Sequence, residues 1–212
     1  MSPLLKLIKI ILVWRATLFV PVILGSLFLN YGSSYPFFEI TYYKDLPFYF
    51  DNLIFKTWAN FDGVHYINIA TRVYITEARF FPLFPITVFL LSLGNISFPF
   101  TFLVGFILPN LFFLGAMVLF YKLLRLDYAD KISQDTILYL LVFPVSFFFV
   151  SVYTESLFLL LLLGSFYFAR KGNWKNTVLL GGVLCLTRFV GVFIIPALIY
   201  EYLIQAKKLR PK

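Results

Sequence analysis

The sequence predicts an all-α polytopic membrane protein, a single bundle of about six transmembrane helices, and three observations support this prediction. First, 61% of its 212 residues are hydrophobic and 13% are charged, proportions that do not fit a soluble domain. Second, several apolar runs reach the roughly 20 residues that a helix needs to cross a bilayer. Third, these runs are continuous in Leu, Ile, Phe and Val, whereas membrane-spanning strands alternate apolar and polar residues.

The first apolar run covers residues 7–29 and is predicted to be an uncleaved signal anchor. Lys6 precedes it, and Lys9 and Arg15 lie in its first half, as in the basic start of a signal sequence. The run is longer than the apolar core of a cleaved signal and has no convincing small-residue cleavage site. We therefore expect a span with its N-terminus in the cytoplasm and an Arg15 side chain that extends to that face.

Residues 30–80 are too polar for the membrane interior and are predicted to form an external loop. Five of the ten acidic residues lie there, namely Glu39, Asp45, Asp51, Asp62 and Glu77. The loop is also rich in Tyr, Phe and Trp, whose rings settle at the headgroup level of a bilayer. Short helices lying in the interface suit this mixture better than a fully solvated loop.

The remaining spans are expected within residues 81–206 of a single domain that covers 1–212. The apolar runs cover 81–93, 100–121, 136–169 and 177–200. The third run would make a helix of about 51 Å, far longer than the bilayer core of about 30 Å. It is therefore predicted to be two helices, broken between Pro144 and Glu155, which brings the apolar segments to about six.

The basic links conflict with a simple alternation of these crossings. Alternation from a cytoplasmic N-terminus places the loop at 30–80 outside and both termini in the cytoplasm. It also places the basic links at 122–134 and 170–175 outside, against the usual bias. Re-entrant segments at 144–156 or 187–188 would remove the conflict, because irregular backbone is tolerated where it lines a cavity.

The net charge of +8 fits an orientation signal better than a nucleic-acid surface. Most of the Lys and Arg residues lie at the ends of predicted spans, where they anchor a membrane protein. No basic stripe with interleaved aromatic residues lies in a soluble segment, so no nucleic-acid partner is predicted. Cys185 is the single cysteine and lies in an apolar run, and no metal site is predicted.

The loop carries a cluster with the chemistry of a general base. A helix that begins at Gly63 brings His65 and Tyr66 one turn from Asp62. A carboxylate beside an imidazole and a phenol could take a proton from a sugar hydroxyl as that hydroxyl attacks an activated donor. The alternative is that Asp62 merely caps the helix.

Two charged residues lie inside the later apolar runs. Glu155, in the segment Tyr153-Thr154-Glu155-Ser156, is costly unless it faces a cavity or a partner, although the segment would also suit a solvated hairpin tip. Arg188 lies near the middle of the last run, where a guanidinium costs about 2.5–3.5 kcal/mol on insertion scales. It would either bind a lipid phosphate through two hydrogen bonds or pair with Glu155.

Four blocks, taken in order, resemble the PIG-V mannosyltransferases, which are GT-C type glycosyltransferases. The blocks are FDGVHYINIA at 61–70, FFPLFP at 80–85, PVSFF at 144–148 with YTESLF at 153–158, and TR at 187–188. The second block alone would also suit an interfacial aromatic belt. The order of all four extends the resemblance over residues 58–191.

The resemblance implies a GT-C-like bundle that transfers mannose, or another hexose, from a polyprenyl or dolichyl phosphate to a lipid or glycan acceptor at the external face. Asp62 then matches the acidic residue of the first external loop, the catalytic base of such enzymes, and no metal or cofactor is implied. Phe61 and Val190 differ from the tryptophan and asparagine common in the family, which bears on acceptor choice. The substrate-binding residues predicted are His65, Tyr66, Glu77, Arg79, Tyr153, Glu155 and Arg188.

The chain resembles the N-terminal half of such an enzyme, because GT-C proteins generally have more spans. The chain would then be a truncated reading frame, a split protein whose other half is separate, or a reduced module. The predicted partners are membrane lipids, the lipid-phosphate sugar and the acceptor, and, if the protein is split, a second polypeptide that completes the bundle. The alternative function is a non-catalytic membrane scaffold or transporter subunit, although no paired half-repeat typical of transporters is visible. Chain length and the lack of a retention signal favour a prokaryotic plasma membrane over the endoplasmic reticulum.

Overall fold

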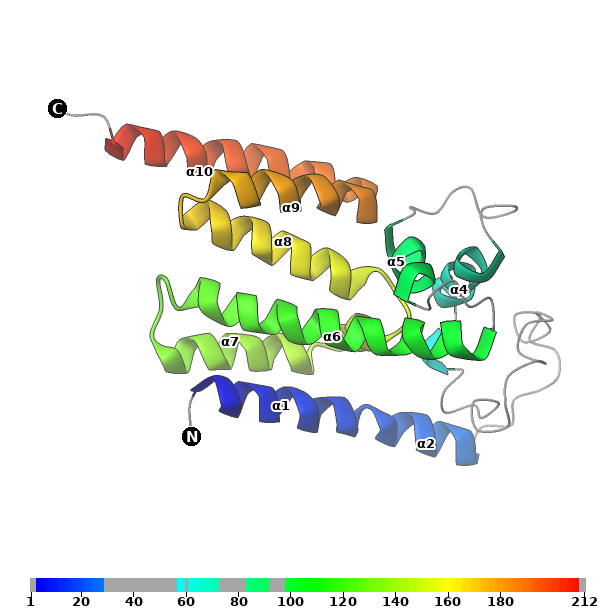
Figure 1. The fold of residues 1–212 in the computed structure, drawn as a ribbon. Coiled ribbons are helices and arrows are strands. Elements are labelled where there is room, and N and C mark those ends of the chain that lie inside the picture. The colour runs from blue at the N-terminus through cyan, green and yellow to red at the C-terminus, as the bar shows by residue number, and fades with distance from the viewer. Residues whose placement is uncertain (1–2, 29–56, 60, 73–82, 92–97, 210–212) are drawn as a thin grey trace.

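The computed structural model describes residues 3–28, 57–59, 61–72, 83–91 and 98–209, and every regular element within these ranges is a helix (Figure 1). The prediction of an all-α protein is thereby confirmed. The elements are α1 (Pro3–Thr17), α2 (Phe19–Phe28), η2 (Thr57–Ala59), α4 (Asp62–Arg72), α5 (Leu83–Leu91), α6 (Phe98–Leu124), α7 (Asp130–Val142), η3 (Ser146–Val150), α8 (Glu155–Arg170), α9 (Trp174–Thr187), η4 (Phe189–Phe193) and α10 (Ile194–Leu209).

Three helical stretches are long and apolar enough to cross a membrane. They are Pro3–Phe28, which combines α1 and α2, Phe100–Leu124 in α6, and Phe189–Lys207, which combines η4 and α10. The first of these stretches overlaps the span predicted at 7–29, and the Leu18 amide donates to the Trp14 carbonyl at 3.2 Å across the junction between α1 and α2. The protein is an all-α membrane protein, and the total of six crossings stays a prediction.

The long apolar runs break where chain length and charge predicted. The run at 136–169 divides into α7 and α8, with the turn at 143–154 between them. The run at 177–200 also divides, because α9 ends at Thr187 and Arg188 has an extended backbone with φ −153° and ψ 142°. Both regions proposed as irregular from the sequence are therefore confirmed as breaks.

Of the expected span at 81–93, the structure describes residues 83–91. The helix found there, α5, has nine residues and a length of about 14 Å, half the thickness of a bilayer core. It packs against α4 at one end of the bundle (Figure 1). Apolar composition alone did not distinguish a crossing helix from one that covers the end of other helices.

The described helices give the molecule two ends of different chemistry. Both chain termini and the links at 125–129 and 171–173 lie at one end, which we call the basic end (Figure 1). The opposite end, the site end, carries α4, α5, the turn at 143–154 and the break after α9 (Figure 1). The basic residues of the terminal turns and links at the first end are Lys6, Lys9, Lys122, Arg125, Lys131, Arg170, Lys171, Lys175 and Lys207. Because α5 lies at the site end, an alternation that leaves α5 out would place the basic links at 125–129 and 171–173 in the cytoplasm, as the charge bias favours.

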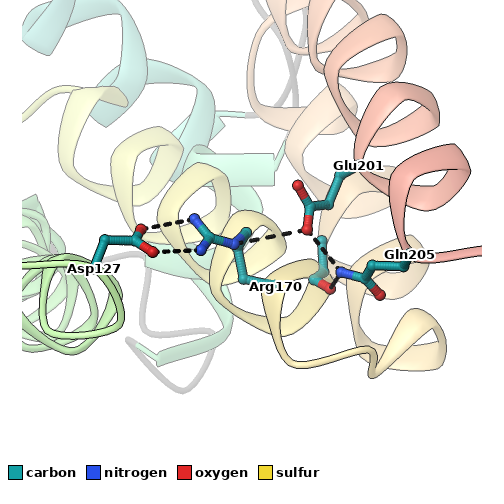
Figure 2. A network of polar contacts seen from close by, with 5 residues as sticks. Asp127, Arg170, Glu201 and Gln205 are labelled. Atoms are coloured by element: carbon teal, nitrogen blue, oxygen red, sulfur yellow. Dashed lines mark hydrogen bonds and ion pairs between the residues drawn. The ribbon is translucent and has the colours of Figure 1, made fainter. Parts of the chain in front are cut away.

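An ion-pair network closes the basic end (Figure 2). The Arg170 guanidinium at the end of α8 donates to both Asp127 carboxylate oxygens, at 2.7 and 2.9 Å, and its Nε lies 3.6 Å from Glu201 of α10. Gln205 Nε2 donates to Glu201 at 2.7 Å and to the Ala169 carbonyl at 2.8 Å. Hydrogen bonding from Arg170 holds the pKa of Asp127 below its ordinary value. The network therefore joins the α6–α7 link, α8 and α10.

The packed core is centred on α6 and α8, which contact each other and most of the remaining described helices. One group of buried side chains surrounds the site end of these helices and includes Ile67, Phe84, Phe102, Val152 and Leu184. A second group joins α1 to α6 and α7 and includes Leu7, Ile11, Phe113, Met117 and Ile137. The first group fixes α4 and α5 against the bundle and so positions the polar residues at that end.

One side chain of the first span lies elsewhere than expected. Arg15 does not extend to the cytoplasmic face, because its Nε donates to Asn110 Oδ1 of α6 at 2.7 Å. The expectation drawn from its distance to the N-terminus was therefore wrong. A partner 95 residues away in the sequence decides its direction.

Candidate functional site

Helix α4 begins at Asp62, one residue before the start at Gly63 that the sequence suggested. Phe61 precedes it with φ 50°, an uncommon conformation for a residue other than glycine, and turns the chain into the helix. Asp62 is exposed, so its carboxylate is accessible from outside the protein. Gly63 packs closely against the turn at 143–154 that precedes α8. A Cβ at this position would lie 3.1 Å from the Val152 carbonyl oxygen. The glycine thus allows α4 to lie directly on the segment that leads to Glu155.

The turn before α8 is fixed to the loop segment before α4 by a backbone hydrogen bond. The Val152 amide donates to the Trp58 carbonyl at 2.8 Å, although the two residues lie far apart in the sequence. Ser151 is held in turn by its hydroxyl, which donates to the Phe147 carbonyl at 3.0 Å. Because Thr154 and Glu155 follow directly, these contacts place them beside α4.

Tyr66 is the residue around which the candidate site gathers. Its side chain is 7% exposed and its ring meets Phe84 of α5 edge-on, with centroids 5.5 Å apart. Burial raises the pKa of the Tyr66 phenol, and the carboxylates of Asp62 and Glu155 act in the same direction. Hydrogen bonding with Thr154 and the charge of Arg188 oppose the shift only in part. The phenol therefore stays protonated at neutral pH and can donate a hydrogen bond.

Glu155 and Arg188 form an ion pair between the start of α8 and the end of α9. Arg188 Nη1 donates to Glu155 Oε1, and the two side chains are 42% and 29% exposed. Arg188 thus lies at a helix end and not in the middle of a helix, which corrects the position inferred from the apolar run. Of the two predicted roles, pairing with Glu155 is confirmed, and the exposure of the guanidinium leaves it accessible to a further anion.

The close approach of η4 to α9 sets the position of Arg188. A Cβ on Gly191 would lie 3.0 Å from the Leu184 carbonyl oxygen and 3.1 Å from two backbone atoms of Cys185. The Gly191 amide donates to the Arg188 carbonyl at 2.9 Å. A side chain at this glycine would therefore displace the turn that carries Arg188.

The structure brings together Asp62, Tyr66, Glu155 and Arg188 from three elements of the site end. Tyr153 is buried in the same core group and its ring packs at 5.4 Å from Phe148, so it forms part of the wall. His65 lies half-buried on α4. Glu77 and Arg79, with residues 80–82 of the aromatic block, lie outside the described residues.

One contact residue was missed from the sequence. Thr154 is buried near the Tyr66 phenol and acts to lower the pKa of that phenol. It stands in the quoted segment YTESLF, but a threonine beside a glutamate has no charge or spacing that marks it. The described residues contain no group of three or more His, Cys, Asp or Glu side chains that could hold a metal ion.

A sequence model of the family described as Mannosyltransferase (PIG-V) matches residues 5–206, most of the chain and all of the site residues described above. The chain belongs to the PIG-V mannosyltransferase family. The resemblance of the four blocks is thereby confirmed, and membership implies that this PIG-V protein is a glycosyltransferase. No curated protein and no solved structure matched the chain.

Proposed function

We propose that this PIG-V family protein transfers mannose, or another hexose, from a polyprenyl or dolichyl phosphate to a lipid or glycan acceptor. The observation that carries the proposal is the position of an exposed carboxylate, Asp62, next to the protonated phenol of Tyr66 and the Glu155–Arg188 pair. These groups supply a base, a hydrogen-bond donor and a cation at one end of a membrane bundle. The described part of the site thus contains groups suited to an acceptor hydroxyl and a phosphate.

The arrangement of charge supports a reaction at the external face. Basic residues concentrate at the end that holds both termini, and such residues remain in the cytoplasm in most membrane proteins. The site end then faces away from the cytoplasm. A lipid-linked sugar presented at that face meets Asp62 without crossing the bundle.

In the proposed reaction, the acceptor hydroxyl oxygen attacks the anomeric carbon of the donor sugar. Asp62 accepts the hydroxyl proton as the new carbon–oxygen bond forms. The bond between the anomeric carbon and the phosphate oxygen breaks on the opposite side, and the lipid phosphate leaves with inversion of configuration. No cofactor or metal ion is needed to balance this step.

Arg188 is suited to the leaving phosphate. A guanidinium can hold phosphate oxygens through two parallel hydrogen bonds, and here Nη1 is already directed to a carboxylate oxygen. Exchange of that carboxylate for the phosphate preserves the charge pairing of Arg188. The Tyr66 phenol supplies a further hydrogen bond to a sugar or phosphate oxygen.

Replacement of the base tests the proposal. The full chain in lipid nanodiscs is supplied with polyprenyl-phosphate mannose and a membrane lipid extract as the acceptor source, and release of polyprenyl phosphate is measured. We expect Asp62→Asn to lower the rate by at least about 100-fold, because an amide cannot accept the proton. Asp135→Asn makes the same change on α7, in the part of that helix nearer the basic end, and is expected to keep the full rate. Transfer at the unmutated rate by Asp62→Asn would overturn the proposal.

A further inference from the structure

The Arg15 guanidinium lies near the middle of the span Pro3–Phe28, where a charge has few polar partners. Its Nε donates to Asn110 Oδ1 at 2.7 Å. Nη1 and Nη2 are buried and have no hydrogen-bond partner among the described residues. The amide of Asn110 is itself held, because its Nδ2 donates to the Phe106 carbonyl at 2.7 Å. This cation is therefore fixed in direction and cannot be a mobile surface charge.

Aromatic rings surround the part of the guanidinium that lacks hydrogen bonds. Its carbon lies 4.0 Å from the centroid of Trp58, 4.8 Å from that of Phe19 and 5.5 Å from that of Phe106. All three distances are within the range of a cation–π interaction, which strengthens when water is excluded. The contacts join α1, α2, η2 and α6 at one point.

Trp58 contacts both Arg15 and the turn that leads to Glu155. Its side chain is 3% exposed, and its carbonyl is the acceptor for the Val152 amide. Trp58 precedes Asp62 by four residues, and Val152 precedes Glu155 by three residues. The two carboxylates of the site are therefore attached to the bundle through the residue that packs on Arg15.

We propose that Arg15 is a positioning residue, which holds the Trp58–Asp62 segment on the membrane helices and so fixes Asp62 relative to Glu155 and Arg188. Arg15 touches no reacting atom, and its effect is transmitted through the ring and the carbonyl of Trp58. The effect on transfer rests on the proposed function above. The effect on the conformation of the segment does not, and the two are measured separately.

Hydrogen–deuterium exchange of the full chain in nanodiscs tests the conformational effect. The Val152 amide and the amides of α4 are compared with those of α8 in Arg15→Gln, Arg15→Lys and the matched control Arg125→Gln in the exposed link at the basic end. We expect Arg15→Gln to accelerate exchange at Val152 and in α4 by about tenfold and to leave α8 unchanged. Arg15→Lys should restore part of the protection because it keeps the cation, and Arg125→Gln should match the unmutated protein. Exchange at Val152 within about twofold of the unmutated rate in Arg15→Gln would overturn the proposal.

The kinetics of sugar transfer give a second measurement, because a loss of folded protein alone would not change kcat and KM in the way that a displaced base does. A displaced base lowers kcat, so Arg15→Gln should reduce kcat about tenfold with little change in the KM for the lipid-phosphate sugar. If the unmutated protein transfers no sugar, the proposed function fails while the exchange measurement still decides the role of Arg15. If Asp62→Asn abolishes transfer and Arg15→Gln changes neither kcat nor exchange, the positioning role fails alone.

Trp58 provides a variant pair in case Arg15→Gln does not fold. Trp58→Phe keeps an aromatic face toward the guanidinium, whereas Trp58→Leu removes it. We expect Trp58→Leu to accelerate exchange at Val152 several-fold more than Trp58→Phe does. Equal exchange in these two variants would contradict the proposal, because the backbone carbonyl that accepts from Val152 is present in both.

Discussion

At the scale of the residue, the site depends on neighbours that change what each group can do. Tyr66 is buried beside two carboxylates, so its phenol is kept in the protonated form, whereas Asp62 on the same helix is exposed. Glu155 and Arg188 neutralise each other while both remain partly accessible. In the proposed reaction, these residues would take the roles of base, hydrogen-bond donor and cation according to their burial.

The raised pKa of Tyr66 predicts how stability changes at high pH. Below pH 10 the phenol is protonated in both the folded and the unfolded protein. As the pH rises above about 10, the unfolded protein ionises first, and the folded protein loses stability until the pH passes the raised pKa. The thermal midpoint of the unmutated protein, measured relative to that of Tyr66→Phe, should therefore fall above pH 10. A constant difference between the two midpoints from pH 8 to 11 would contradict the assignment.

The Glu155–Arg188 pair should matter more for transfer than for stability. Both partners are partly exposed, so a double-mutant cycle of Glu155→Gln and Arg188→Gln should give a coupling below about 1 kcal/mol in unfolding. The same Glu155→Gln change should lower the rate of sugar transfer at least tenfold, because it removes the group that orients the guanidinium. A large loss of stability with an unchanged transfer rate would assign the pair a structural role instead.

At the scale of the element, glycine positions determine how closely the site helices approach. Gly191 lies against the backbone of the last turn of α9, which cannot move aside as a flexible side chain would. Gly182 lies within α9. A Cβ at this position would have no atom within 4 Å apart from those of its chain neighbours and the backbone of its own helix. The two glycines therefore form a matched pair for substitution.

Gly191→Ala should destabilise the protein and displace Arg188, whereas Gly182→Ala should do neither. The first change forces η4 away from α9 at a cost of about 1–3 kcal/mol. The second replaces a glycine inside an α-helix and should be neutral or stabilise by up to about 1 kcal/mol. Thermal unfolding and transfer rates of the two variants check this. Equal effects at both positions would show that the close contact at Gly191 does not contribute to stability or to the position of Arg188.

At the scale of the whole molecule, the basic network and the candidate site occupy opposite ends of the bundle (Figures 1 and 2). The distribution of basic residues therefore predicts an orientation in which the Asp127–Arg170 ion pair faces the cytoplasm and α4 lies outside. Single cysteines placed at Tyr128 and Phe61, which are 51% and 67% exposed, test it in a Cys185→Ala background. In intact cells a membrane-impermeant maleimide should label position 61 and leave position 128 unlabelled until the membrane is opened. The reverse pattern would place the site in the cytoplasm.

The sequence predicted those parts of the architecture that follow from length, composition and single charges. The run at 136–169 had to break because no bilayer is thick enough for it, and Arg188 marked the second break. It did not predict that α5 would cover the end of the bundle, because nine apolar residues serve either purpose. The direction of Arg15 depends on Asn110 and Trp58, which only the folded chain brings near it.

We expect the exposed ring of Phe61 to set the depth of the site in the membrane. An exposed Phe ring on an interfacial helix inserts at the boundary between headgroups and acyl chains, and this one stands directly before the exposed Asp62 at the turn into α4. The phosphate of a lipid-linked sugar is confined to the same thin layer. In the proposed reaction, a lipid-linked donor that diffuses laterally would meet the carboxylate in a two-dimensional search, whereas a sugar free in solution would seldom be held at that level. The depth of the site in the membrane would then favour lipid-borne donors over soluble ones, before any side chain contacts the sugar.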